Sequence, residues 1–507
     1  MYAQATGIGI IGLKGFTVTA ESSLEKGTSQ FDIVGLGDAA VQESRRRVSA
    51  ALTNCGWPLE QCRITVNLSP ADVRKSGSGF DLPILVSLLE AKGEIKTDRD
   101  TAFIGEVSLD GRLCPVRGVL PMAAAAAENG IKRVFVPKQN VTEASIVRGI
   151  EVYGVESIEQ LVKIFSGELK AEAAPPFKPD NSAFLPEEDF SEVKGQENIK
   201  LAIEVACAGF HNMLMIGPPG SGKSMLAKRI ATVLPPMTFE ESVAVTEIHS
   251  VAGLLSDKKP FIAQRPYRPV SHTSTTAGII GGGAKSPMPG EISLAHNGVL
   301  FLDELPEFRR DVLESLRQPL EDGQIVLSRA TGKVAYPCSV MLIAAMNPCP
   351  CGNYGSGRSC TCSPVAIRKY LGKISQPVLD RIDIQTEVNA VRYEDIAGGT
   401  EGLSSAQMRE HILAAREIQR QRFKGTDISF NSNIPPRLLH EYCKLDSDAE
   451  ALIRASFDSM GVSARAYDRI LKVARTAADL DGSQIIKRRH LSRALQYRSL
   501  DKKYWRV

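Results

Sequence analysis

Hydrophobic and polar positions divide the chain into blocks with different periods. Up to residue 165, alternating segments such as 16–20 (FTVTA), typical of half-buried strands, mix with helical runs such as 122–128. From residue 191 to 395, short apolar strands alternate with helical stretches, as expected of a parallel sheet covered by helices. From residue 396 to 507, apolar residues recur at helical spacing.

These patterns predict an α/β protein with an α+β domain over 1–165, an α/β core with a parallel sheet over 191–395 and a helical domain over 396–507. Residues 166–190 are rich in proline, charge and small side chains without a sustained period, which indicates a linker. A chain of 507 residues is also too long for one hydrophobic core.

A glycine-rich loop follows the apolar strand 212–216 and opens a helix near Lys223. It fits G-x-x-x-x-G-K-[ST], in which backbone N–H groups and the helix N-terminus bind phosphates. Lys223 is expected to reach the β- and γ-phosphates of ATP, and Ser224 to ligate Mg²⁺. The predicted nucleotide-binding residues are Gly217, Pro218, Pro219, Gly220, Ser221, Gly222, Lys223 and Ser224.

Two further apolar strands end in polar side chains. In 298–304 (GVLFLDE), Asp303 is predicted to hold Mg²⁺ through water, and Glu304 to polarise the attacking water as general base. Strand 340–347 ends in Asn347, placed to orient that water. The alternatives are solvent-facing acids at a strand end and a turn asparagine. Together with the glycine-rich loop, these groups predict a magnesium-dependent ATPase.

This arrangement resembles the AAA+ ATPases, in which Asn347 would occupy the sensor 1 position. LDRID (379–383) is similar to the arginine-finger segment of that superfamily, and SAR (463–465) to its sensor 2. The resemblance implies that Arg381 contacts the γ-phosphate of the neighbouring subunit and that Arg465 contacts the nucleotide from the lid. An arginine supplied in trans implies a ring, expected to be a homo-hexamer. An intrachain salt bridge is the alternative for each arginine.

Four cysteines follow Asn347 closely. Cys349, Cys351, Cys360 and Cys362 form two C-x-C pairs around a glycine- and serine-rich loop, so four thiolates can converge on one structural Zn²⁺. The spacing departs from the usual C-x₂-C. Chance clustering and a redox pair remain the alternatives. A closed four-thiolate site would hold a loop rather than catalyse a reaction.

Two insertions distinguish this core. Residues 265–298 are so rich in glycine, serine, threonine and proline that a mobile loop is expected, with cations at Arg265, Arg268 and Lys285. Residues 323–343 predict a hairpin with basic side chains beside its tip, which could grip phosphates in the pore of a ring. A solvated hairpin tip is the alternative. The predicted DNA-binding residues are Lys285, Arg329 and Lys333.

Segments 76–95 and 111–140 of the N-terminal block resemble the proteolytic domain of Lon proteases. In that resemblance the serine position falls at about Gly79 and the lysine position at Leu120, so neither a nucleophile nor a base is supplied. The implied domain has a Lon/S5-like fold without its catalytic dyad and without peptidase chemistry, as in RadA-type recombination proteins.

The full combination resembles the magnesium-chelatase-like proteins of the YifB/ComM family over nearly the whole chain. This resemblance implies a hexameric ATPase that binds single-stranded and branched DNA and drives branch migration in homologous recombination and natural transformation, with recombinase-linked partners. A magnesium-chelatase-type remodelling ATPase and a protein unfoldase are the alternatives. A cationic pore would favour DNA, and a pore lined by aromatic and apolar loops would favour an unfoldase.

Composition and charge limit the partners and the cellular compartment expected for the protein. The net charge of +3 means that nucleic-acid contacts must come from local basic patches. No apolar run approaches the roughly 20 residues of a membrane span, and residues 1–16 lack a basic n-region. A cytoplasmic protein is therefore expected, with no membrane contact and with its ten cysteines in a reducing compartment.

Overall fold

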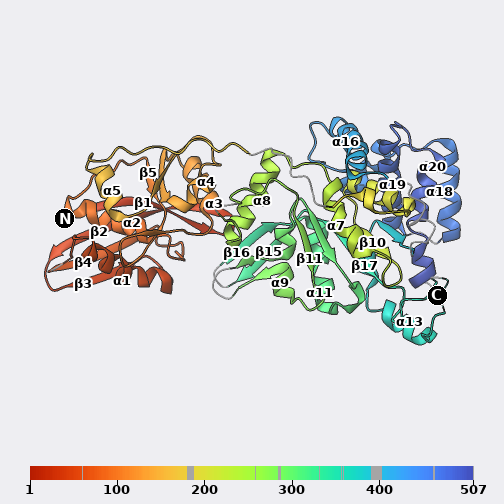
Figure 1. Cartoon of the computed structure of the whole chain (residues 1–507), viewed down its shortest axis with the longest axis horizontal. Helices are drawn as coiled ribbons and strands as arrows, with labels where there is room; N and C mark the ends of the chain where they lie inside the picture. Colours follow the sequence, from red (N-terminus) through yellow and green to blue (C-terminus); the bar gives the residue numbers. More distant parts are fainter. Residues whose placement is uncertain are drawn as a thin grey trace.

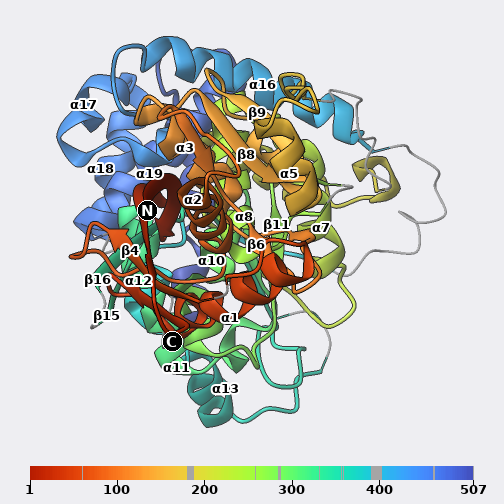
Figure 2. The same ribbon diagram turned by 90° about the vertical axis from the view of Figure 1, so that its left-hand side faces the viewer.

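The molecule is elongated, with three structural regions in chain order along its length (Figure 1). Figure 2 looks from the N-terminal end and shows the N-terminal sheet and helices in front of the core. The computed structural model describes residues 1–59, 61–179, 188–256, 259–283, 287–329, 332–355, 357, 359–389, 402–460 and 463–505. None of the helices in these ranges is long and apolar enough to cross a bilayer.

The N-terminal region is built on a seven-stranded mixed sheet with the order β3-β4-β2-β1-β5-β8-β9. The alternating segment 16–20 lies within β2, where side chains alternate between buried and partly exposed as expected. The run 122–128 lies in α3. The strands are β1 (Tyr2–Ile11), β2 (Lys14–Lys26), β3 (Gln30–Val34), β4 (Cys62–Ser69), β5 (Thr101–Phe103), β8 (Arg133–Pro137) and β9 (Glu151–Val155). The helices are α1 (Ala39–Asn54), α2 (Asp81–Lys92), α3 (Val119–Glu128), α4 (Val141–Ala144) and α5 (Ile158–Phe165).

The central region contains a five-stranded sheet with the order β11-β14-β17-β10-β18, and every neighbouring pair is parallel. All residues of β10, β14 and β17 are buried, which explains their continuous apolar runs, since helices and loops cover both faces of a parallel sheet. The predicted α/β core with a parallel sheet is confirmed. Its strands are β11 (Tyr267–Val270), β14 (Val299–Leu302), β17 (Met341–Met346), β10 (Met213–Ile216) and β18 (Ile384–Glu387).

Alternate side chains of β10 belong to two separate hydrophobic clusters. Met213 and Met215 pack with α6 (Glu197–Gly209), α7 (Lys223–Val233) and the lid helices. Leu214 and Ile216 belong to the opposite cluster, which includes side chains of the hairpin formed by β15 (Gln324–Arg329) and β16 (Gly332–Pro337). The sheet therefore joins the lid on one face to the hairpin on the other.

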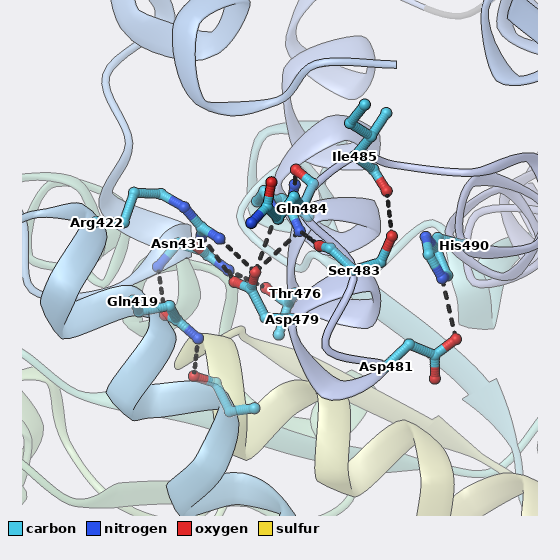
Figure 3. Close-up of polar contacts among 12 residues, drawn as sticks. Gln419, Arg422, Asn431, Thr476, Asp479, Asp481, Ser483, Gln484, Ile485 and His490 are labelled. Atoms are coloured by element: carbon cyan, nitrogen blue, oxygen red, sulfur yellow. Dashed lines mark hydrogen bonds and ion pairs between the residues drawn. The ribbon is translucent and has the colours of Figure 1, made fainter. Parts of the chain in front are cut away.

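The C-terminal region is helical, as the spacing predicts. Its amphipathic segments form α16 (Ser405–Arg422), α18 (Ser447–Met460), α19 (Ala464–Leu480) and α20 (Arg488–Gln496). Inside it, the carboxylate of Asp479 accepts hydrogen bonds from Arg422, Arg475 and Asn431 (Figure 3). This network joins α16 to α19 at a point where the Asp479 side chain is 0% exposed.

Among the described residues, the N-terminal region contacts the core at α8 (Phe239–Ala252) and, as a second place, at the β15–β16 hairpin. The Glu143 carboxylate accepts a hydrogen bond from Ser250 Oγ in α8, and the Gly118 N–H donates to the Ser250 carbonyl at 3.3 Å. At the second place, the turn between β1 and β2 lies so close to the hairpin that a Cβ on Gly12 would collide with Val334. The β15–β16 hairpin therefore lies beside the N-terminal sheet (Figure 1).

Candidate nucleotide-binding site

The loop between β10 and α7 has the backbone shape that a phosphate-binding loop requires. Gly220 and Gly222 have φ values of +76° and +87°, in the left-handed region that side chains with a Cβ rarely adopt. Helix α7 begins at Lys223, so the N–H groups of its first turn face the loop. All eight predicted nucleotide-binding residues lie in this loop or at the start of α7.

Lys223 is buried within the loop. Its Nζ donates to the carbonyls of Gly217 at 2.8 Å and Pro218 at 2.9 Å, and to Asn347 Oδ1 at 3.2 Å. Burial lowers the pKa of this amine, and the nearby Asp303 carboxylate opposes that effect. Asn347 follows β17, the strand next to β10, so sheet order brings the asparagine to the lysine. The Lys223 ammonium group therefore lies where the phosphate oxygens of a bound nucleotide could replace the loop carbonyls as its hydrogen-bond acceptors.

Ser224 and Asp303 meet at the carboxyl edge of the sheet. The Ser224 hydroxyl donates to Asp303 Oδ2 at 2.6 Å, although the two residues are far apart in sequence. The other carboxylate oxygen of Asp303 accepts the Glu304 N–H at 2.9 Å. A hydroxyl beside a carboxylate suits Mg²⁺, which takes oxygen ligands and keeps several waters.

Glu304 has an unusual backbone and a partner that the sequence did not indicate. Its φ is +53°, and its side chain is 57% exposed. The carboxylate oxygen Oε2 lies 3.4 Å from Nδ1 of His272. His272 follows β11, and β11 pairs with β14, the strand that leads to Glu304. The site therefore includes an imidazole within reach of the carboxylate predicted to activate water.

The prediction of a mobile loop over 265–298 is wrong for most of that segment. Residues Tyr267–Val270 form the edge strand β11 of the core sheet, and short helices and strands follow. The Arg265 side chain is 7% exposed and pairs with Glu241 at 2.9 Å, and it also donates to the Asn297 carbonyl at 2.7 Å. Arg268 pairs with Glu291 at 2.6 Å. Both arginines stabilise the core and are not free cations.

The two arginines implied by the AAA+ resemblance occupy different environments. The Arg381 side chain is 7% exposed and pairs with Glu321 at 2.7 Å, and it also donates to the Pro377 carbonyl at 2.9 Å. This is the intrachain salt bridge that was the alternative. Arg465 is exposed in the first turn of α19, which Ser463 caps. Contact of Arg381 with a neighbouring subunit stays a prediction.

The four predicted zinc ligands come together. Their sulfur atoms all lie within 4.8 Å of one another. Cys349 Sγ is 3.4 Å from Cys351 Sγ and 3.8 Å from Cys360 Sγ, while the Cys351 and Cys360 sulfurs are 3.6 Å apart. Tetrahedral Zn²⁺ with Zn–S bonds of about 2.3 Å separates its sulfurs by about 3.8 Å. Backbone N–H groups lower the pKa of the Cys351 thiol to about 5, whereas desolvation and the neighbouring sulfurs raise the pKa values of Cys360 and Cys362. The donor set, completed by Cys362, fits zinc.

Of the predicted DNA-binding cations, Lys333 is exposed at the start of β16. Arg329 ends β15, and its backbone pairs with Gly332 across the hairpin. The hairpin itself forms as predicted. Lys285 lies outside the described residues. The hairpin thus carries an exposed cation near its tip, beside the N-terminal sheet.

The two positions compared with a Lon-type dyad hold no catalytic group. Leu120 is fully buried in the first turn of α3, and its N–H donates to Glu143 Oε1 at 2.9 Å. Gly79 has no side chain, and the nearby hydroxyl of Ser78 donates to the Glu106 carboxylate. This part of the chain therefore offers no lysine base at the α3 position.

Family models cover most of the chain in three consecutive matches. The model described as magnesium chelatase, subunit ChlI, matches residues 189–396. The model described as subunit ChlI of Mg-chelatase matches residues 20–140, and the ChlI C-terminal model matches residues 402–498.

Curated relatives match over nearly their full length. An uncharacterised protein of Mycobacterium tuberculosis is 40% identical over 94% of this chain and 95% of its own. Competence protein ComM of Haemophilus influenzae is 40% identical over 99% of this chain and 97% of its own. The uncharacterised protein YifB of Escherichia coli is 39% identical over 97% of this chain and 96% of its own. The chain therefore belongs to the ComM/YifB family of magnesium-chelatase-like proteins, whose core is of the AAA+ ATPase type.

Proposed function

We propose that this protein is a cytoplasmic, ATP-driven DNA motor that promotes branch migration during homologous recombination and natural transformation. Single-stranded and branched DNA would be its substrates. The observation that carries the proposal is the meeting of Lys223, Ser224, Asp303 and Asn347 at one edge of the parallel sheet. These are the groups that an ATP- and Mg²⁺-dependent hydrolase needs in one place.

In the proposed cycle, ATP phosphates replace the carbonyl and amide oxygens that now accept hydrogen bonds from Lys223. Ser224 would ligate Mg²⁺, and Asp303 would hold the ion through water. Glu304 accepts a proton from the attacking water, and Asn347 orients that water. Each group acts at the carboxyl end of a core strand or at the loop that follows it, so one sheet positions the whole site.

A ring of six identical subunits would complete each site with Arg381 of a neighbour, while Arg465 would contact the nucleotide from the lid. Arg381 is held by Glu321 within its own chain, so it must leave this ion pair to reach the adjacent nucleotide. Glu321 is 57% exposed, so solvent can reach the carboxylate side of this ion pair, whereas the Arg381 side chain is only 7% exposed.

The exposed Lys333, together with Arg329 and Lys285, supplies the proposed DNA contacts. Their positive charge suits a phosphate backbone. The name of the competence protein from Haemophilus influenzae also supports a role in DNA uptake or recombination. The absence of a lysine at position 120 argues against ATP-dependent proteolysis, the reaction of Lon-type enzymes.

We also propose that Cys349, Cys351, Cys360 and Cys362 hold a structural Zn²⁺. The support is the distance of 4.8 Å or less between all four sulfur atoms. When bound, such an ion has no open position for a substrate and stabilises the loop that carries its ligands.

The first test uses a fluorescent four-way DNA junction with wild-type protein and Lys223→Ala. We expect ATP-dependent junction processing by the wild type and its loss in the variant, because nucleotide binding requires the cation. Gel separation of the junction and its products measures the effect.

A matched control is Lys228→Ala, on the same helix, where the side chain is 63% exposed and pairs with Glu188. This variant should process the junction at the wild-type rate. Wild-type protein that neither processes junctions nor shows DNA-stimulated ATP hydrolysis would exclude the DNA motor and favour a remodelling ATPase or unfoldase.

The contact between His272 and Glu304 predicts a second effect. His272→Ala should raise ATP turnover without DNA by about two- to fivefold, because the exposed imidazole contact restrains the Glu304 carboxylate only weakly and its loss frees the carboxylate to meet water. Steady-state phosphate release measures the change. His440→Ala, an exposed histidine of the lid, should leave turnover unchanged. A fall in turnover for His272→Ala would instead assign the imidazole to positioning of the base.

A further inference from the structure

The cysteine loop, defined as residues 348–355, 357 and 359–362, lies directly against the phosphate-binding loop. Gly352 has a φ of +81° and sits so close to Pro219 that a Cβ at position 352 would collide with the proline ring. Pro219 is one of the predicted nucleotide-binding residues. A displacement of the cysteine loop at Gly352 would therefore remove the contact that holds Pro219 of the phosphate-binding loop in position.

The same loop is also joined to the site through the chain itself. It begins directly after Asn347, whose Oδ1 accepts a hydrogen bond from Lys223 at 3.2 Å. Cys349, two residues further on, is fully buried, and its sulfur accepts the Tyr354 N–H at 3.3 Å. A metal ion that holds Cys349 in place therefore also holds the backbone that follows Asn347 in place.

On its other side, the cysteine loop packs against the C-terminal segment. The rings of Tyr354 and Tyr504 lie 6.1 Å apart, edge to face, and the Tyr504 hydroxyl donates to Glu387 at 2.7 Å. Glu387 ends β18, the strand beside β10. The cysteine loop therefore lies between the phosphate loop and a segment anchored to the core sheet.

The shape of such a loop depends on what its sulfurs bind. Four thiolates within 4.8 Å of one another repel strongly unless a cation neutralises them or protons return to the sulfurs. Metal binding releases the thiol protons and closes the loop around the ion, so occupancy and loop geometry are linked.

We propose that the cysteine loop is a metal-held brace for the nucleotide site, so that zinc bound by the four thiolates increases the affinity of the phosphate loop for ATP. This inference rests on the zinc site proposed above and does not depend on DNA being the substrate. Gly352 transmits the effect to Pro219, and Cys349 transmits it to Asn347.

The test measures zinc per chain by atomic emission and ATP affinity with a fluorescent ATP analogue, on the full-length protein. Protein as purified should contain about one zinc per chain. Removing the metal with a zinc-selective chelator, in excess Mg²⁺, should weaken nucleotide binding by about tenfold, and added Zn²⁺ should restore it. Because the wild-type chain is used, this arm does not depend on the folding of a variant.

Three variants locate the effect. Cys360→Ser should lose zinc and bind ATP as weakly as the stripped protein. Pro219→Ala should keep zinc but bind ATP more weakly, because it removes the ring on which Gly352 rests. Cys62→Ser, a half-buried cysteine in β4 outside the cluster, should retain both zinc and affinity.

Equal ATP affinity for the protein with and without zinc would overturn the proposal that zinc supports the nucleotide site. Protein that contains no zinc and whose cluster cysteines are found as disulfides by mass spectrometry would overturn the metal site itself. If ATP affinity depends on zinc but the protein does not process DNA junctions, the DNA motor is rejected. The proposed effect of zinc on the nucleotide site is then retained.

Discussion

Glu304→Gln is expected to stop ATP hydrolysis while leaving ATP binding intact. Glutamine keeps the size and shape of the side chain but cannot accept a proton from water. General-base catalysis contributes about 10²- to 10⁴-fold, so turnover should fall by that factor. The variant should bind ATP as tightly as the wild type because Lys223, Ser224 and Asp303 are unchanged. A long-lived ATP complex should result, and it should favour assembly of the proposed ring.

The measurement combines phosphate release, nucleotide affinity and sedimentation in ATP. Glu307→Gln is the matched control, since Glu307 lies three residues further on, is 43% exposed and pairs with Lys373. It should hydrolyse ATP normally. If Glu304→Gln retained wild-type turnover, another group would have to be the general base, and His272 would be examined first.

Much of the nucleotide site could be predicted because its residues follow recognisable strands. In a parallel sheet the carboxyl ends of the strands share one edge, so Ser224, Asp303 and Asn347 had to lie close together once their strands were identified. The cysteine cluster was predictable for a similar reason, because two C-x-C pairs joined by a short loop have few ways to separate.

His272 could not be found in this way because its strand is hard to recognise. β11 has only four residues and includes Pro269, which cannot donate a hydrogen bond to a neighbouring strand. It lies at the edge of the sheet, where proline is tolerated. Neighbouring glycines and serines then made the segment resemble a mobile loop, although its backbone pairs with β14.

The intrachain partner of Arg381 could not be predicted from the sequence, for a different reason. A motif can indicate that an arginine lies near a subunit boundary, but it does not show which carboxylate the arginine contacts within its own chain. The ion pair with Glu321 depends on how α12 (Arg317–Asp322) packs beside the segment after α14 (Gln376–Leu379), and no local pattern encodes that packing.

The largest effect on stability is expected at Asp479, in the lid. Its carboxylate accepts a hydrogen bond from Arg422 NH1 at 2.8 Å, from Asn431 at 2.8 Å and from Arg475 Nε at 3.1 Å. The Arg475 side chain is 1% exposed, and NH1 of its guanidinium also donates to the Gln484 carbonyl at 2.8 Å. Figure 3 shows the side chains of Arg422 and Asn431 pointing toward Asp479.

Asp479→Ala would leave two arginines without their carboxylate in a buried setting. Breaking a buried ion pair by removing one partner costs about 3–5 kcal/mol. At about 4 °C per kcal/mol for a domain of this size, the lid should therefore unfold at a temperature lower by about 12–20 °C in a calorimetric scan. Because α19 also carries Arg465 in its first turn, ATP turnover should fall at temperatures where the lid is melted and recover on cooling.

Asp481→Ala is the matched control for this experiment. Asp481 lies two residues away and pairs with His490 and Arg489, but its side chain is 32% exposed. Partly solvated pairs contribute up to about 1 kcal/mol, so its loss should shift the transition by only a few degrees. Equal shifts for the two variants would mean that apolar packing of α16 against α19, rather than the buried carboxylate, holds the lid together.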